Sequence, residues 1–157
     1  MSVRVRILLV EDSEFVAAAM EGVFAVFAED ASLQIVGSLA QAFAQLDDEV
    51  FDAIVLDLSL PDSEPHETLA RVRQRVNDIP IVVVTGYSPK DVDRSLAADW
   101  IEKAATPLPE VVVRVLRAAA VARKAAHIAD SELASLGRAI DNLRESASLP
   151  ENGGAGS

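Results

Sequence analysis

The sequence predicts an α/β fold, in which a doubly wound, five-stranded parallel sheet is followed by an extended C-terminal helix. Short, continuous apolar runs recur along the chain. Such runs are typical of strands that are buried on both faces, as in parallel sheets. Segments with apolar residues at helical spacing separate these runs, and this alternation indicates βαβ units. A last helical pattern, far longer than the others, starts at about Pro107.

Five strands are expected. Each is rich in β-branched or aliphatic residues and is bounded by polar or turn-forming residues. The predicted strands are residues 3–10, 33–36, 51–58, 79–85 and 100–101.

Four helices are expected, one after each of the first four strands. Ser13 can cap the first helix, which carries Phe15, Met20 and Phe24 at helical spacing. The other three are predicted at residues 41–46, 67–76 and 89–97. Pro61 and Pro65 mark a loop before the third helix.

Composition narrows the classes of protein that the chain can belong to. Its 157 residues suggest one domain plus an appendage, and its net charge of −11 argues against direct nucleic-acid binding. It has no cysteine, which excludes disulfides and thiolate sites, and two histidines are too few for an all-histidine zinc site. No apolar run is long enough to span a membrane, and the first apolar run is too short for a signal peptide. We therefore expect a cytoplasmic protein without membrane contact.

Polar residues follow four of the predicted strands. Glu11 and Asp12 follow the first strand, Asp57 ends the third, Thr85 ends the fourth and Lys103 follows the fifth. The carboxyl ends of parallel strands lie on one rim of the sheet, where ligands bind in open α/β folds. Three carboxylates repel one another unless a cation joins them, and oxygen ligands favour Mg²⁺. An aspartate can also act as a nucleophile toward phosphorus.

The sequence resembles the receiver domains of response regulators in two-component signalling. Four segments carry the resemblance, which covers about residues 4–122. They are residues 7–13 (ILLVEDS), 52–62 (DAIVLDLSLPD), 80–86 (PIVVVTG) and 99–103 (DWIEK). The resemblance implies a flavodoxin-like (βα)₅ fold with strand order 2-1-3-4-5.

By this resemblance, Asp57 is the phosphoacceptor. Glu11, Asp12 and Asp57, with the backbone carbonyl of Ser59, are expected to hold Mg²⁺ as the cofactor. The resemblance also implies that the phosphoryl group comes from a histidine kinase or a histidine phosphotransfer protein.

The resemblance assigns roles to the residues around this site. Thr85 and Lys103 contact the phosphoryl group, and Trp100 takes the position of the switch aromatic residue, although a buried anchor that never rotates is an equal alternative. Ser59 and Tyr87, each two positions after a site residue, tune dephosphorylation by controlling access of water.

The chain departs from the family pattern at three points. The connection from Thr85 to Lys103 is about one helical turn short, so the fourth helix must be short. Ala104 stands where proline is frequent. Pro65 stands where glycine is frequent, so either the loop differs or the third helix starts there.

The C-terminal helical pattern contains a heptad seam from Val112 to Ala147. Every seam position is apolar, which is typical of a coiled coil. The first three turns are expected to pack on the receiver sheet, and the rest to form a parallel homodimer. The strongest seam residues are Leu133, Leu136, Ile140 and Leu143.

A break in this helix is an alternative, because Asp130 and Ser131 could cap a new helix that folds back as a hairpin. We divide the chain into a receiver domain at 1–122, a helical extension at 123–148 and a flexible tail at 149–157. No segment is long enough for an output domain. Two alternatives remain open: the output is contact with other proteins, or the sequence is a fragment of a longer protein.

Two functions fit these features. The first is a phosphorylation-dependent signalling receiver that is not an enzyme beyond its own aspartyl phosphorylation and dephosphorylation. The second is a receiver-fold dimerisation or adaptor module without a working phospho-switch. A phosphohydrolase with a nucleophilic aspartate usually carries Asp-x-Asp, and Asp57-Leu58-Ser59 lacks it.

Overall fold

The computed structural model describes residues 4–148 and has the fold that the sequence predicts. Its five strands form one parallel sheet in the order β2-β1-β3-β4-β5. The strands are β1 (Val5–Val10), β2 (Ala31–Val36), β3 (Ala53–Leu56), β4 (Ile81–Thr85) and β5 (Asp99–Glu102). Both the doubly wound architecture and the strand order are confirmed.

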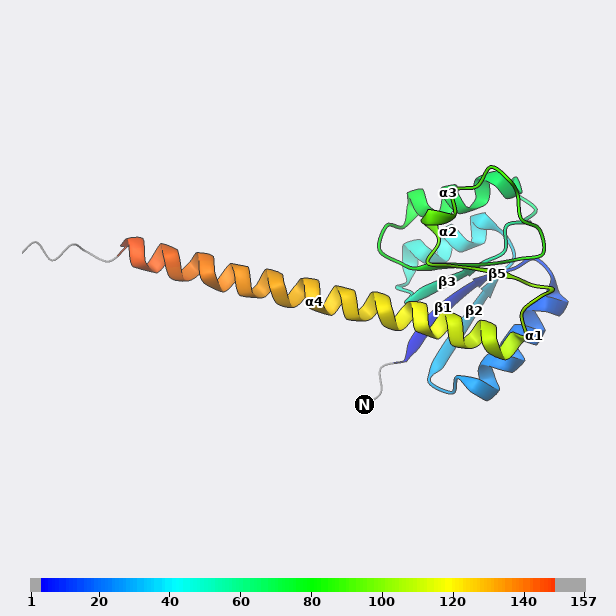
Figure 1. Ribbon diagram of the computed structural model, residues 1–157, viewed down its shortest axis with the longest axis horizontal. Helices are drawn as coiled ribbons and strands as arrows, with labels where there is room; N and C mark the ends of the chain where they lie inside the picture. The colour runs from blue at the N-terminus through cyan, green and yellow to red at the C-terminus, as the bar shows by residue number, and fades with distance from the viewer. Residues whose placement is uncertain (1–3, 149–157) are drawn as a thin grey trace, which may run out of the picture. The chain divides into compact units, whose positions relative to one another are not determined.

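Helices cover both faces of the sheet (Figure 1). On one face lie α1 (Glu14–Phe27) and the first turns of α4 (Leu108–Ser148). On the other face lie α2 (Leu39–Asp48) and α3 (Pro65–Arg75). A 3₁₀ turn, η1 (Arg94–Leu96), lies between β4 and β5.

Local signals in the sequence set where the helices begin. The Ser13 hydroxyl accepts a hydrogen bond from the Val16 N–H at the start of α1, and Ser38 caps α2 in the same way. Pro65 occupies the first turn of α3, where its missing N–H costs nothing. The helix therefore starts at Pro65, the second of the two outcomes left open for this position.

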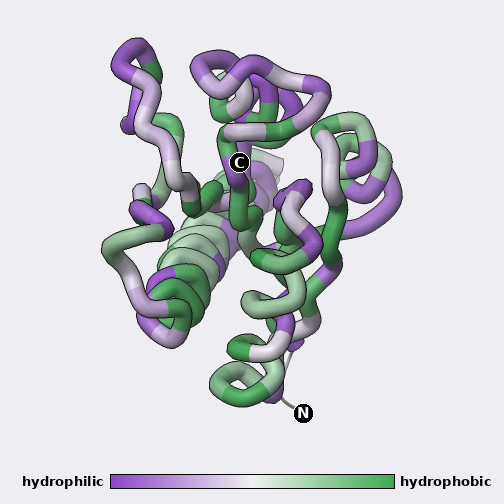
Figure 2. Tube along the Cα trace, turned by 90° about the vertical axis from the view of Figure 1, so that its right-hand side faces the viewer, coloured by the Kyte–Doolittle hydropathy of each residue, from purple (hydrophilic) through white to green (hydrophobic). Residues whose placement is uncertain are grey.

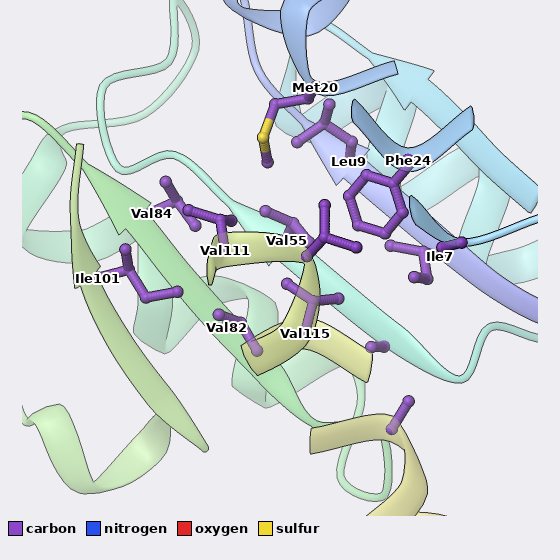
Figure 3. Close-up of a cluster of buried hydrophobic side chains, with 14 of the residues drawn as sticks. Ile7, Leu9, Met20, Phe24, Val55, Val82, Val84, Ile101, Val111 and Val115 are labelled. Atoms are coloured by element: carbon purple, nitrogen blue, oxygen red, sulfur yellow. The ribbon is translucent and has the colours of Figure 1, made fainter. Parts of the chain in front are cut away.

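The core has one hydrophobic cluster on each face of the sheet. In the first cluster, strand side chains such as Val55 and Val82 point toward Met20 and Phe24 of α1 and toward Val115 of α4 (Figure 3). The second cluster packs the opposite face of the strands against α2 and α3. Hydrophilic residues lie in the outer loops and on outer turns of helices (Figure 2). Because β3 and β4 are buried along their whole length, close packing fixes the position of Thr85, which ends β4, and of Asp57, which follows β3.

The predicted helix at residues 89–97 is wrong. The structure has only the η1 turn there, capped by the Asp93 carboxylate, which accepts a hydrogen bond from the Ser95 N–H. The segment offers few large apolar residues to face the sheet, and Val92 and Leu96 pack there without a regular helix. Tertiary packing of an extended connection replaces the short helix.

The chain divides into two compact units, one up to Arg123 and one from Lys124 onward. In the first unit, α4 buries Val112, Val115 and Ala119 in the core. The helix is continuous through Asp130, where the sequence left a break open. The predicted tail at 149–157 lies outside the described residues, and so does Val3, the first residue of the predicted strand at 3–10. Within residues 4–148, no helix is long and apolar enough to cross a membrane.

Candidate functional site

Three carboxylates meet at the carboxyl edge of the sheet. Glu11 and Asp12 follow β1 and Asp57 follows β3, and each offers an oxygen within 4.8 Å of the others. Glu11 and Asp57 are buried, whereas Asp12 is exposed. The strands β1 and β3 are direct neighbours, which is why residues far apart in the sequence converge here. Carboxylate oxygens at this spacing are the ligands that a hard cation such as Mg²⁺ requires.

Lys103 reaches two of these carboxylates from the loop after β5. Its Nζ lies 2.6 Å from Glu11 Oε2 and 3.2 Å from Asp57 Oδ2. The Lys103 N–H also donates to the Thr85 carbonyl at 3.0 Å, which fixes the start of the loop. The ammonium group therefore partly neutralises the acidic cluster and lies beside the nucleophile candidate, Asp57.

The site is electrostatically coupled. Burial raises the pKa of Glu11, the Lys103 ammonium lowers it, and the charge on Asp57 raises it again, so the net direction is upward. Burial alone would lower the pKa of Lys103, but its hydrogen bond to Glu11 and the charge on Asp57 outweigh burial and raise it. Lys103 therefore stays charged beside the acidic cluster.

Backbone contacts order the loops around Asp57 and Thr85. The Ser59 N–H donates to Asp57 Oδ1 at 3.3 Å. The Thr85 hydroxyl donates to the Tyr87 carbonyl at 2.9 Å and accepts from the Tyr87 N–H at 3.2 Å. The Tyr87 side chain itself is mostly exposed. The Thr85 hydroxyl is therefore hydrogen-bonded to the backbone of the loop that follows β4.

Trp100 lies on β5, half-buried against the second core cluster. The Arg94 guanidinium covers its ring at 4.4 Å from the ring centroid, a favourable cation–π contact. Its indole Nε1 is buried and has no hydrogen-bond partner among the described residues. An unpaired buried N–H is unfavourable by about 1–3 kcal/mol.

A hollow of about 560 Å³ adjoins the acidic cluster. Asp12 and Ser59 line it on the side of the cluster, and Asp62, Glu64 and Arg71 line it on the side of α3. This opening gives a ligand or a partner side chain access to the exposed carboxylate of Asp12.

Two structural residues were missed in the sequence: Asp62, which lines the hollow beside the site, and Arg73, which lies away from it. Both oxygens of Asp62 accept hydrogen bonds, from the Leu39 and Ala40 N–H groups at the start of α2, each at 2.9 Å. Arg73 donates to the Leu96 carbonyl and to three carbonyls that follow α3. The Asp62 contacts with α2 and the Arg73 contact with Leu96 carry no local signal, because these partners lie on other elements.

Comparisons with known proteins agree with this architecture. The family model for the response regulator receiver domain matches residues 7–106. A signal receiver domain of a LuxO repressor protein from Vibrio parahaemolyticus is 23% identical, with a TM-score of 0.69, and the match covers 80% of this chain and 97% of that one. The non-phosphorylated HemR receiver domain from Leptospira biflexa is 26% identical, with a TM-score of 0.62 and coverages of 74% and 94%.

A third similar structure is the response regulator TrrA from Thermotoga maritima in complex with Mg²⁺ and BeF. It is 20% identical, with a TM-score of 0.59, and the match covers 73% of this chain and 98% of that one. A comparison with curated proteins finds no match.

The fold and the acidic cluster define a signalling module rather than a conventional enzyme. The chain belongs to the response regulator receiver domain family. Receiver domains generally partner with histidine kinases, and the acidic pocket of Glu11, Asp12 and Asp57 is consistent with phospho-signalling.

Proposed function

We propose that this protein is a phosphorylation-dependent signalling receiver that accepts a phosphoryl group on Asp57 from a histidine kinase or a histidine phosphotransfer protein. The observation that supports this most is the cluster of Glu11, Asp12 and Asp57 within 4.8 Å, with Lys103 Nζ at 3.2 Å from Asp57. A nucleophilic carboxylate, cation ligands and a charge-neutralising ammonium group are the components that phosphoryl transfer requires.

The proposed step forms an aspartyl phosphate. One Asp57 oxygen attacks phosphorus, the new O–P bond forms, and the bond from phosphorus to the donor nitrogen breaks. The donor histidine leaves with the electron pair and takes up a proton. Lys103 then lies beside the added phosphoryl oxygens, and Thr85 can donate its hydroxyl to them in exchange for the Tyr87 carbonyl.

Mg²⁺ fits the proposed site because its donor set is three carboxylates. The Ser59 carbonyl is proposed as a further oxygen ligand. When bound, the ion would neutralise charge on the transferring group. Ser59 and Tyr87 flank the site and are proposed to tune dephosphorylation. Trp100 is proposed as the switch aromatic residue, since its unpaired indole N–H leaves this conformation unfavourable.

We propose output through protein contacts, with the C-terminal extension as the dimerising element. Its seam residues, Leu133, Leu136, Ile140 and Leu143, are all exposed in the single chain. Receiver residues 1–122, the extension 123–148 and a tail at 149–157 remain the proposed division. A cytoplasmic location follows from the expected kinase partner.

Intact-protein mass after incubation with acetyl phosphate tests this proposal. The wild type should gain one phosphoryl group only when Mg²⁺ is present, and Asp57→Ala should gain none while keeping its circular dichroism spectrum. Asp62→Asn is the matched control, because Asp62 lies near the site but outside the carboxylate cluster, and it should still be phosphorylated. Equal labelling of wild type and Asp57→Ala would refute the assignment.

A second candidate is a receiver-fold adaptor without a working phospho-switch. The irregular connection between β4 and β5 favours it, because a helix is usual there in the family and the structure has only η1. This candidate requires no phosphorylation in any condition and no effect of Mg²⁺ on association.

A further inference from the structure

The extension presents an apolar stripe at coiled-coil spacing. Leu133, Leu136, Ile140 and Leu143 of α4 expose between 41% and 71% of their surface. They repeat at alternating steps of three and four residues, and nothing in the described residues covers them. Burial of such a stripe against a complementary helix is favourable, because it removes apolar surface from water. The charged residues beside the stripe indicate the orientation of the partner helix.

The heptad assigns each flanking charge to a position. Leu133 and Ile140 take position a, and Leu136 and Leu143 take position d. The residues beside the seam at position e are Asp130, Gly137 and Arg144, and those at position g are Ala125, Glu132, Ala139 and Ser146.

A parallel pair of these helices has no attractive charge pair along the seam. In that orientation each g residue faces the next e residue of the second copy. Glu132 would face Gly137. Asp130 and Arg144 would each face an alanine, Ala125 or Ala139.

An antiparallel pair with the same seam brings opposite charges together. When Leu133 faces Leu143 and Leu136 faces Ile140, e residues face e residues, so Asp130 of one copy faces Arg144 of the other. The two-fold axis of such a pair repeats this contact. Opposite charges at facing positions set helix orientation and partner choice.

Gly137 supports the same orientation. A Cβ at Gly137 would meet nothing within 4 Å in the single chain, and no described glycine has positive φ. Glycine in a helix interior is unfavourable by about 1 kcal/mol relative to alanine, so the chain alone gives no reason for it. In the antiparallel pair, Gly137 and Ala139 lie on the two sides of the axis, where small residues allow the backbones to approach closely.

We propose that the extension pairs with a second copy of this chain in antiparallel orientation, from about Ala129 to Ala147, with two Asp130–Arg144 ion pairs. The charges favour this orientation over the parallel one that the seam alone suggested. The inference rests on the dimerisation in the proposed function, but it is independent of phosphorylation.

Single-cysteine variants of the full chain test the orientation, because the wild type has no cysteine. In the antiparallel pair the two copies of residue 139 face each other, so Ala139→Cys should form a disulfide-linked dimer under mild oxidation. Residue 147 faces residue 129, so Ala147→Cys should remain largely unlinked. A parallel pair requires the reverse result, because seam residues then meet their own copies.

Charge exchange gives a second test by analytical ultracentrifugation. Asp130→Arg and Arg144→Asp should each weaken the dimer by about tenfold, which corresponds to about 1.4 kcal/mol. The double variant should recover wild-type affinity. Arg138→Glu is the matched control, because Arg138 lies on the outer face of the helix and its exchange should change the affinity little.

The outcomes separate this inference from the proposed function. A monomer at all concentrations would overturn both dimerisation and orientation. A dimer that links through Ala147→Cys, or that the double variant does not restore, would overturn the orientation alone. Neither result affects labelling of Asp57, which the mass measurement tests separately.

Discussion

Lys103 Nζ lies 2.6 Å from Glu11 Oε2, closer than to the phosphoacceptor candidate Asp57. Glu11 is nearly fully buried, and the ammonium group offsets a charge that burial makes unfavourable. A cation that binds the carboxylate cluster must therefore share Glu11 with Lys103 or displace it. This contact links the proposed metal site to the proposed phosphoacceptor.

Removing the ammonium group should make stability depend more strongly on Mg²⁺. Lys103→Met leaves Glu11 and Asp57 without a cation, so without Mg²⁺ it should lower the free energy of unfolding by about 2–3 kcal/mol. Added Mg²⁺ should recover more stability in this variant than in the wild type. Urea unfolding with and without Mg²⁺ measures this difference.

The matched control for Lys103→Met is Arg75→Met. It breaks an exposed ion pair with Asp47 and should cost less than 1 kcal/mol, independently of Mg²⁺. The same Mg²⁺ response in the wild type and in Lys103→Met would show that Lys103 does not compete with the cation.

Acid should weaken the contact between β5 and α4. The hydrogen bond from Arg114 holds the pKa of Asp99 below its usual value. A lowered pKa in the folded state contributes stability above the unfolded pKa of about 3.9, and this is lost as pH falls through the folded value.

The stability difference between wild type and Asp99→Asn, about 1 kcal/mol at pH 7, should therefore shrink below about pH 4. Unfolding measured from pH 3 to pH 7 tests this. A difference that stays constant over that range would contradict an ionic role for Asp99.

Arg73 should contribute more to the free energy of unfolding than an ordinary surface arginine does. Its guanidinium donates to Leu96 and to the carbonyls of Val76, Asn77 and Ile79. Arg73→Met leaves these carbonyls, of which three are half-buried, without a donor and should cost about 2–3 kcal/mol. Hydrogen exchange should increase around η1 in this variant and remain unchanged in α2. Protection that is unaltered near Leu96 would remove Arg73 from this role.

Asp62 should stabilise α2 without taking part in phosphorylation. Amide N–H groups of Leu39 and Ala40 lower its pKa although burial acts in the other direction, and both bonds are lost in Asp62→Ala. The cost should be about 1 kcal/mol, and Asp62→Asn should lose less because it keeps an acceptor. Phosphorylation should stay within about twofold of wild type in both variants. Loss of labelling in Asp62→Asn would place this carboxylate in the chemistry.

The sequence predicted the sheet because most of its strands are short continuous apolar runs that alternate with segments of helical spacing, a pattern that indicates βαβ units. It predicted the acidic cluster because parallel strands bring their carboxyl ends to one rim, so the positions of Glu11 and Asp57 at strand ends were sufficient. The helix at 89–97 was wrong because local propensity could not reveal that Val92 and Leu96 pack without a helix.

Other features had no local signal. The Lys103–Glu11 contact, the Asp62 contacts with α2 and the Arg73 contacts with η1 all join distant elements. The seam of α4 was visible as a repeat, and its first positions, Val112 and Val115, pack in the receiver core, as expected for the first three turns. Hydrophobic spacing alone does not distinguish packing in a core from packing in a coiled coil.

Locating the phosphoryl group on the chain tests the central claim most directly. Borohydride reduces an aspartyl phosphate to homoserine, which peptide mass spectrometry can assign to one residue. After treatment with acetyl phosphate and Mg²⁺, homoserine should appear at position 57 alone and should be absent when Mg²⁺ is omitted. Homoserine at Asp12, Asp52 or Asp62, or at no position, would contradict the account.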